Sequence, residues 1–170
     1  TYYPHPRNIL KKEEGLKSLM SIDEKLKIFE TYGFDYVLII SFNNSFANVT
    51  ASDFLNNIVI KYFNPQKIII GYDHHFGKRR EGTSSFLKTF SKNFDFNVEV
   101  LDPIKYKDKT VSSSLIRKLI INGEVSVAKD YLKRFYGFDA IVISGSGIGS
   151  SLGFPTANFI PIEKNQLIPM

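Results

Sequence analysis

Blocks of apolar residues with two different periods run along the chain and predict strands that alternate with helices. Two blocks, residues 36–40 (YVLII) and 67–71 (KIIIG), are short and branched, which is typical of strands buried on both faces of a sheet. A third strand is predicted over residues 96–101 (FNVEVL). Between them, apolar residues recur at helical spacing behind serine and threonine caps. We therefore expect an α/β chain with parallel βαβ units, in which ligands bind beyond the carboxyl ends of the strands.

Polar capping residues set the expected starts of the helices. Ser21 and Glu24 form a capping box, and Gly33 is expected to end the helix that follows. Thr50 and Asp53 are expected to cap a second helix. Its inward residues should be Phe54, Leu55, Ile58 and Tyr62. Later helices are expected from Thr83 to near Asn93, from Ser112 or Ser113 to Gly123, and over residues 125–133.

The pattern changes after Arg134. Residues 138–144 (FDAIVIS) predict a strand, a glycine loop follows over residues 145–153, and no helix is expected next. This indicates the start of a β-rich domain, although about 35 residues are too few to bury a core of their own. We therefore expect a fragment of a longer chain, rather than a tail that packs on the first domain. The N-terminal residues 1–3 (TYY) also look like the end of a strand that has lost its beginning.

Composition narrows the class of protein. With 43% apolar residues the chain can bury a core, and no apolar run approaches the roughly 20 residues of a membrane span. The absence of cysteine excludes disulfides, thiol catalysis and cysteine metal sites, and it fits a reducing, cytoplasmic location. No signal peptide is visible. The net charge of +5 suits either nucleic acid or a polyphosphate substrate.

Two polar segments directly follow predicted strands. In residues 4–7 (PHPR), two prolines stiffen the backbone around His5, which either faces a ligand or is simply exposed. Residues 71–82 (GYDHHFGKRREG) contain three glycines and Asp73, an acceptor for a base or ribose donor. The basic residues 78–80 face either phosphate or solvent. The adjacent His74 and His75 point to opposite sides of an extended segment, so they are a poor metal pair.

The third polar segment is residues 111–117 (VSSSLIR). Serines open a helix whose first N–H groups lack helical partners and whose start carries the positive end of the helix dipole. With Arg117, expected in the first turn, this makes an anion site. The alternative is an ordinary serine cap with a solvated arginine. The glycine loop at residues 145–153 is likewise either a phosphate cradle or a flexible hairpin, and it lacks the ending of a P-loop.

Taken in order, these motifs resemble the prokaryotic bifunctional riboflavin kinase/FMN adenylyltransferase family, also called FAD synthetase. The motifs are Pro4-His5-Pro6, the segment Gly71–Gly77, the segment Ser112–Arg117, and Gly153-Phe154-Pro155-Thr156-Ala157-Asn158, which is similar to the Pro-Thr-Ala-Asn motif of the family's kinase module. The resemblance covers essentially the whole chain. It implies a Rossmann-like nucleotidyltransferase parallel sheet in an adenylyltransferase domain over residues 1–125. The start of a β-barrel riboflavin kinase module would follow over residues 126–170.

The resemblance also implies roles for single residues. His5 and Pro6 would line the flavin side of the site. Asp73 would contact the adenosine portion of ATP, with Phe76 shaping the pocket. The triphosphate would be held by Ser113, Ser114 and Arg117, with Ser114 standing where the family usually has threonine. In the kinase module, phosphates and Mg²⁺ would be bound by Gly145, Gly147, Thr156 and Asn158.

Two family elements have no counterpart in the sequence. The His-x-Gly-His motif, which stabilises charge at the α-phosphate, would lie before Thr1. The catalytic glutamate of the kinase module would lie beyond Met170, and Glu163 has no claim to that role. We therefore assign no catalytic residue, and we expect the fragment alone to be inactive.

The resemblance implies an enzyme that transfers AMP from ATP to FMN with Mg²⁺, giving FAD and pyrophosphate, and that also phosphorylates riboflavin to FMN. One alternative is another nucleotidyltransferase, acting on pantetheine phosphate or a nicotinamide nucleotide, against which the Pro-Thr-Ala-Asn tail argues. The other is a nucleic-acid-binding module. Against it, the aromatic residues fall within predicted strands and helices, and the basic residues are scattered. We expect small-molecule substrates, with no nucleic acid and no membrane partner.

Overall fold

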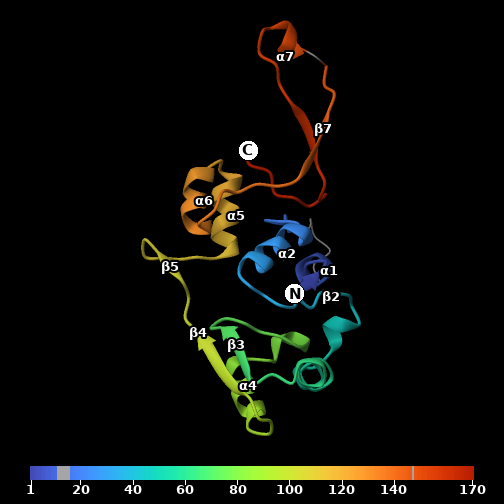
Figure 1. The fold of residues 1–170 in the computed structure, drawn as a ribbon, viewed down its shortest axis with the longest axis vertical. Helices are drawn as coiled ribbons and strands as arrows, with labels where there is room; N and C mark the ends of the chain where they lie inside the picture. Colours follow the sequence, from blue (N-terminus) through green and yellow to red (C-terminus); the bar gives the residue numbers. More distant parts are fainter. Residues whose placement is uncertain (11–15, 147) are drawn as a thin grey trace. The chain divides into compact units, whose positions relative to one another are not determined.

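The computed structural model describes residues 1–10, 16–146 and 148–170 (Figure 1). The chain forms two compact units. The first comprises the described residues of 1–12 and 39–110, and the second comprises those of 13–38 and 111–170. Both units mix helices with short strands, as predicted for an α/β chain.

The first unit contains β1 and α1 near the N-terminus and then the run of elements from β2 to β6. Their bounds are β1 (Tyr2–Tyr3), α1 (Pro6–Leu10), β2 (Ile40–Ser41), η1 (Phe46–Asn48), α3 (Ala51–Phe54), η2 (Leu55–Phe63), β3 (Lys67–Gly71), η3 (Lys78–Arg80), α4 (Ser84–Ser91), β4 (Asn97–Leu101), β5 (Lys105–Tyr106) and β6 (Lys109–Thr110). The strand β3, the helix α4 and the strand β4 form a parallel βαβ unit, with Lys67 opposite Asn97 and Gly71 opposite Leu101.

In the described part of the chain, the strands form four two-stranded sheets. The pairs β1–β2 and β3–β4 are parallel, whereas β5–β6 and β7–β8 are antiparallel. The parallel pairing of the predicted strands at residues 67–71 and 96–101 is confirmed. A single continuous parallel sheet stays a prediction.

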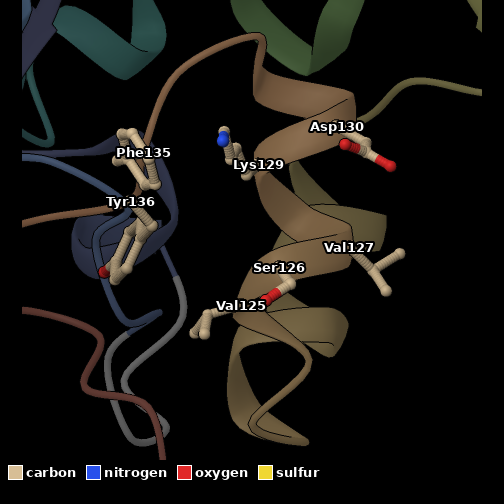
Figure 2. A pocket seen from close by; sticks show the side chains of 7 residues that line it. All are labelled: Val125, Ser126, Val127, Lys129, Asp130, Phe135 and Tyr136. Carbon is tan, nitrogen blue, oxygen red and sulfur yellow. The ribbon is translucent and has the colours of Figure 1, made fainter.

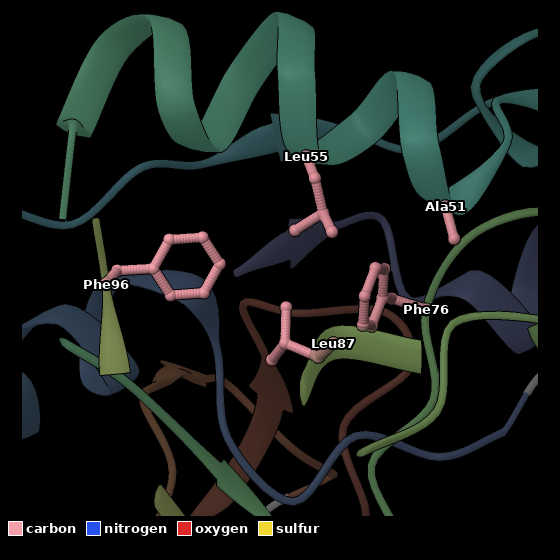
Figure 3. Close-up of a cluster of buried hydrophobic side chains, with 5 residues drawn as sticks. All are labelled: Ala51, Leu55, Phe76, Leu87 and Phe96. Atoms are coloured by element: carbon pink, nitrogen blue, oxygen red, sulfur yellow. The ribbon is translucent and has the colours of Figure 1, made fainter. Parts of the chain in front are cut away.

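The core of the first unit lies between α3–η2, α4 and the loop that follows β3 (Figure 3). Leu55 and Ala51 point from the helix toward Phe76, Leu87 and Phe96. Leu87 is 1% exposed. Burial of this apolar surface is the main force that holds the unit together.

The second unit is built around a helical pair and a hairpin. Its elements are α2 (Ile22–Thr31), α5 (Ser113–Ile121), α6 (Val125–Leu132), β7 (Ala140–Ile143), α7 (Ile148–Ser151) and β8 (Asn158–Pro161). A cluster centred on Ile116, Ile120 and Ala128 packs α5 against α6, with Leu167 of the C-terminal segment completing it. The buried Gln166 side chain donates to the Tyr136 hydroxyl at 2.8 Å, so its polar group is satisfied.

The predicted helix starts are confirmed where a local cap specifies them. Ser21, Thr83 and Ser112 each accept a hydrogen bond from the backbone N–H three residues later. Gly33 follows the end of α2 with φ +75°, as expected for a helix-terminating glycine. The helix at residues 125–133 and the strand within 138–144 are also present.

The strand predicted at residues 36–40 is wrong in extent and in burial. Only Ile40–Ser41 is a strand, and Tyr36 is 87% exposed. In the observed register Tyr2 lies opposite Ile40, and the Ile40 N–H donates to the Thr1 carbonyl. The strand β3 is likewise not buried on both faces, because Ile69 is 55% exposed.

The inward face predicted for the second helix is only partly correct, because Phe54 and Leu55 pack in the core as predicted but Tyr62 does not. Thr50 caps the helix as predicted, but residues 55–63 wind as a π-helix. Its i→i+5 hydrogen bonds put more residues into each turn than the 3.6 of an α-helix. The apolar face therefore shifts, so Val59 and Ile60 pack on the core while Tyr62 is 68% exposed. A further correction concerns the glycine loop after residue 144, because the short helix α7 interrupts a segment predicted to be free of helix.

Candidate functional site

A pocket of about 800 Å³ lies in the first unit, and its walls come from segments that follow β1, β2 and β3. His5 and Pro6 follow β1, Phe42 follows β2, and Phe76 lies in the loop after β3. The pocket thus occupies the kind of position predicted for this fold class, next to the carboxyl ends of strands. Three of the residues predicted to bind ligand, His5, Pro6 and Phe76, line the same cavity.

Aromatic rings in edge-to-face and tilted contact line this pocket. Tyr2 contacts Phe42 with ring centroids 5.5 Å apart, and Phe42 contacts Phe46 at 5.8 Å. Phe46 and Phe54 are 6.2 Å apart, and Phe54 and Phe76 are 5.7 Å apart. These separations fall in the favourable range for aromatic pairs. The result is a continuous apolar wall suited to a flat aromatic ligand.

The loop over residues 76–82, called the basic loop below, closes on itself. Phe76 and Gly82 exchange backbone hydrogen bonds of 3.1 and 2.9 Å. Gly77 has φ 72° and ψ 174°, a conformation that is essentially restricted to glycine. A Cβ at Gly77 would lie 2.5 Å from the Ala51 nitrogen, so this glycine lets the basic loop lie directly against the start of α3.

Two further hydrogen bonds tie the basic loop to the start of α3. The Lys78 N–H donates to the Val49 carbonyl at 2.8 Å. The Ala51 N–H, which has no helical partner at this position, donates to Glu81 Oε1 at 2.7 Å. The carboxylate of Glu81 therefore caps the helix from a distance of 30 residues along the chain. These contacts hold the basic loop as a defined part of the pocket.

Positive charge lines the same pocket. Arg7, Lys78, Arg79 and Arg80 contribute to the lining, and within the part of the chain that the structure describes no aspartate or glutamate lines the pocket. Cations in a concave surface concentrate anionic ligands near it. The pocket therefore combines an aromatic wall with an anion-attracting wall.

His5 has a local structural role beside its place in the pocket. The Arg7 N–H donates to His5 Nδ1 at 3.2 Å, and the Asn8 N–H donates to the His5 carbonyl at 2.9 Å. His5 therefore caps α1, with Pro6 at the first helical position that proline favours. With Nδ1 accepting a hydrogen bond, the neutral imidazole carries its proton on Nε2.

Asp73 and His74 lie in the turn between β3 and the basic loop. Asp73 is exposed and does not line the pocket. The ring of His74 stacks on Phe76 with centroids 6.1 Å apart. Burial lowers the pKa of His74, and the neighbouring His75 and Arg80 lower it further, against the opposing effect of Asp73. The His74 imidazole is therefore favoured in its neutral form.

The serine and arginine segment belongs to the second unit. Ser112 caps α5, accepting from the Leu115 N–H at 3.2 Å, and Ser113 and Ser114 are exposed in the first turn. Arg117 lies one turn further on, so its predicted place in the first turn is wrong. Its Nε donates to the Lys17 carbonyl at 2.9 Å. The side chain thus braces the segment before α2, a role that local helix patterning does not reveal.

The C-terminal hairpin brings two of the predicted kinase-module residues, Gly145 and Asn158, beside one another. Antiparallel pairing sets Ile143 opposite Asn158. The side-chain amide of Asn158 lies against Gly145, leaving no room there for a Cβ. A Cβ at Gly149 would lie 2.9 Å from Thr156 Oγ1. Gly147, the other glycine predicted to bind phosphate, lies outside the described residues.

A second hollow, of about 510 Å³, lies beside α6, and no sequence motif falls on it (Figure 2). Lys129 reaches toward Phe135, with Nζ 4.1 Å from the ring centroid, a cation–π contact. In the same view, Val127 and Asp130 point away from the side chains of Phe135 and Tyr136.

Sequence reasoning missed the pocket residues between β2 and α3. Phe46, Ala47 and Val49 line the pocket, held in a turn in which the Phe46 N–H donates to Asn43 Oδ1 at 2.8 Å. Two signals could have found them. The segment directly follows a predicted strand, and its Asn-Asn-Ser run is typical of a side-chain-stabilised turn.

Comparison with known families decides between the classes that the sequence left open. A family model described as FAD synthetase matches residues 1–115, and one described as riboflavin kinase matches residues 132–170. The chain belongs to the FAD synthetase family. The first of these matches contains the whole aromatic and basic pocket.

Relatives of this chain carry the name bifunctional riboflavin kinase/FMN adenylyltransferase. The protein from Buchnera aphidicola subsp. Schizaphis graminum is 36% identical over 165 residues, which cover 96% of this chain and 53% of the relative. The protein from Bacillus subtilis is 30% identical over 172 residues, covering 99% of this chain and 53% of the relative. The chain thus spans about half the length of these curated relatives.

A solved structure described as a macrolide-efflux protein from Streptococcus pneumoniae has a closely similar fold. Its TM-score is 0.87 at 26% sequence identity, over 99% of this chain and 54% of that protein. Among the described residues, no helix has the length and apolar character needed to cross a membrane.

Proposed function

We propose that this chain carries an FMN adenylyltransferase site, which transfers AMP from ATP to FMN and releases FAD and pyrophosphate. The family match over residues 1–115 carries the proposal. The pocket supports it, because FMN joins a flat aromatic ring to a phosphate and the pocket offers an aromatic wall and a cationic wall. The substrates are small molecules, and we place the reaction in the cytoplasm.

In the proposed reaction, an oxygen of the FMN phosphate attacks the α-phosphorus of ATP. The bond from that phosphorus to the bridging oxygen breaks, and pyrophosphate leaves with the bonding electrons. No side-chain nucleophile is required. The protein contributes the alignment of the two phosphates and the stabilisation of the charge that builds up between them.

We propose one role for each group of site residues. The flavin lies against His5 and Pro6, and the adenosine portion of ATP lies by Asp73 and Phe76. The triphosphate is bound at the start of α5, by the following residues: Ser113, Ser114 and Arg117. Support for the flavin side comes from His5 and Pro6, which line the same pocket. Exposed N–H groups at a helix start suit a triphosphate.

We further propose that residues 1–125 form the adenylyltransferase domain, with a Rossmann-like parallel sheet, and that residues 126–170 begin a β-barrel riboflavin kinase module. The kinase module phosphorylates riboflavin to FMN in the whole protein. Its phosphates and Mg²⁺ are bound near Gly145, Gly147, Thr156 and Asn158. The hydroxyl of Thr156 and the amide oxygen of Asn158 are oxygen donors, which suit Mg²⁺.

Mg²⁺ enters the proposed adenylyl transfer with the nucleotide. The described residues contain no group of three or more histidine, aspartate or glutamate side chains that could hold a metal ion. Mg²⁺ commonly takes most of its ligands from nucleotide phosphates and water, so such a group is not required. When bound, the ion neutralises charge on the departing pyrophosphate.

The test is steady-state kinetics of Arg117 variants in the complete gene product, with FAD separated by chromatography. Arg117→Ala is expected to lower kcat/KM for FAD formation by about 1.5–3 kcal/mol in transition-state terms, because a charge-assisted phosphate contact is lost. Arg117→Lys should recover part of this, keeping the charge without the planar fork. Riboflavin phosphorylation should be unaffected. Unchanged FAD formation, or an equal loss of both activities, would refute the role of Arg117.

A further inference from the structure

We propose that the basic loop makes the pocket selective for phosphorylated flavin, with Lys78, Arg79 and Arg80 binding the phosphate monoester of FMN. This inference rests on the proposed function, in which the pocket holds the flavin. FMN and riboflavin share the ring system and the ribityl chain and differ only by the phosphate. An apolar wall alone binds both about equally, so discrimination requires groups that interact with the phosphate.

The charge of the lining is the first support. Lys78, Arg79 and Arg80 line the same cavity as the aromatic rings, and none of the described residues that line it is an aspartate or glutamate. Among the residues that the structure describes, these three side chains form no ion pair with aspartate or glutamate. Their positive charge therefore belongs to the lining of the pocket. Arginine is suited to a phosphate monoester because its planar fork matches two phosphate oxygens.

The rigidity of the basic loop is the second support. Its ends are joined by the backbone pairing of Phe76 with Gly82, and Glu81 fixes it to Ala51. Long cationic side chains lose much conformational freedom on binding, and a fixed backbone reduces what must be ordered. A loop anchored in this way can hold two or three cations around one anion.

Backbone conformation adds a third observation. Arg79 has φ 53° and Arg80 has φ 64°, so two successive non-glycine residues are left-handed. Such residues cost conformational free energy and are concentrated at ligand clamps and active sites. The four hydrogen bonds that close and anchor the basic loop stabilise this conformation.

The test is titration of FMN and, separately, riboflavin into the 170-residue chain, followed by quenching of flavin fluorescence. The variants are Lys78→Gln, Arg79→Gln and Arg80→Gln, singly and with the two arginines combined. Lys92→Gln is the matched control, because Lys92 is an exposed cation of the same unit outside the pocket lining. Loss of a charge-assisted phosphate contact should weaken FMN binding roughly tenfold per contact, with riboflavin binding and the control unchanged.

The possible outcomes separate this proposal from the one on which it rests. If the unsubstituted chain binds riboflavin and FMN with equal affinity, or if the variants weaken both flavins equally, the basic loop does not select the phosphate and the flavin site stands. Unchanged FMN binding in all of the Lys78, Arg79 and Arg80 variants would show that these cations do not bind its phosphate and would overturn this proposal. If neither flavin binds the unsubstituted chain, the flavin site itself is refuted, and the selectivity falls with it.

Discussion

Gly77→Ala tests directly whether the basic loop is held against α3. The substitution has two costs. A left-handed φ of 72° with ψ near 174° is almost exclusive to glycine, so an alanine that adopts this conformation loses about 1–3 kcal/mol. The new Cβ would also lie 2.5 Å from the Ala51 nitrogen and 2.7 Å from its Cα. These are backbone atoms that cannot rotate away, and such overpacking costs a further 1–3 kcal/mol or so. We therefore expect a total loss of roughly 2–6 kcal/mol.

Two other glycines serve as controls for this experiment. Gly33 has φ +75°, and a Cβ there would find no atom within 4 Å, so Gly33→Ala carries strain without a clash. It is expected to cost about 1 kcal/mol. Gly71, in the same unit as Gly77, lacks the positive φ, and its Cβ would make an ordinary 3.7 Å contact. Gly71→Ala is expected to be close to neutral.

The assay is urea unfolding of each variant, followed by circular dichroism, together with FMN titration. The predicted order of destabilisation is Gly77→Ala, then Gly33→Ala, then Gly71→Ala. Only Gly77→Ala should also weaken FMN binding, because displacement of the basic loop moves its cations. If Gly77→Ala costs no more than Gly33→Ala, the basic loop is not packed against the start of α3, and the reasoning fails.

Two further predictions concern the groups around the basic loop. Glu81→Ala should destabilise the chain by about 1–2 kcal/mol, because the Ala51 N–H loses its acceptor. Glu81→Gln keeps an acceptor oxygen and should lose less than half of that stability. Equal losses for the two variants in urea unfolding would contradict the capping role. His74 has a pKa lowered from 6.5 by burial, so the unfolded state binds more protons. Its contribution to stability is complete above about pH 6.5 and is lost as the pH falls through the lower folded pKa. The free energy of unfolding of the His74→Gln variant should therefore depend less on pH. Identical pH profiles for the variant and the unsubstituted chain would count against this.

The parts of the fold that could be predicted are those set by local chemistry. The helix caps are one example, at Ser21, Thr83 and Ser112. Each hydroxyl accepts from the backbone N–H three residues later, so the cap depends only on the local sequence. The strand at residues 67–71 follows from a dense β-branched run and the strand at residues 97–101 from alternating valines, and the two pair along five residues each.

The parts that could not be predicted depend on distant partners. Residues 55–63 have an apolar pattern that fits an α-helix, and only packing against the core distinguishes the π-helix. Nothing near Arg117 in the sequence indicates that Lys17 provides its acceptor, 100 residues away. The hydrogen bond from the Ala51 N–H to Glu81, 30 residues away, is likewise not indicated by the neighbouring sequence. For the pocket, the motifs found His5 and Phe76, but the wall at Phe46 and Ala47 carries no motif.

The central claim is that the pocket between the aromatic wall and the basic loop is the flavin site. Titration of FMN into the ¹⁵N-labelled chain, followed by amide chemical shifts, tests it most directly. The account predicts saturable shifts concentrated at the amides of His5, Ala47 and Lys78, with Phe135 beside the α6 hollow unaffected. Shifts centred on the α6 hollow instead, or no saturable shifts in the lining of the pocket, would contradict the account.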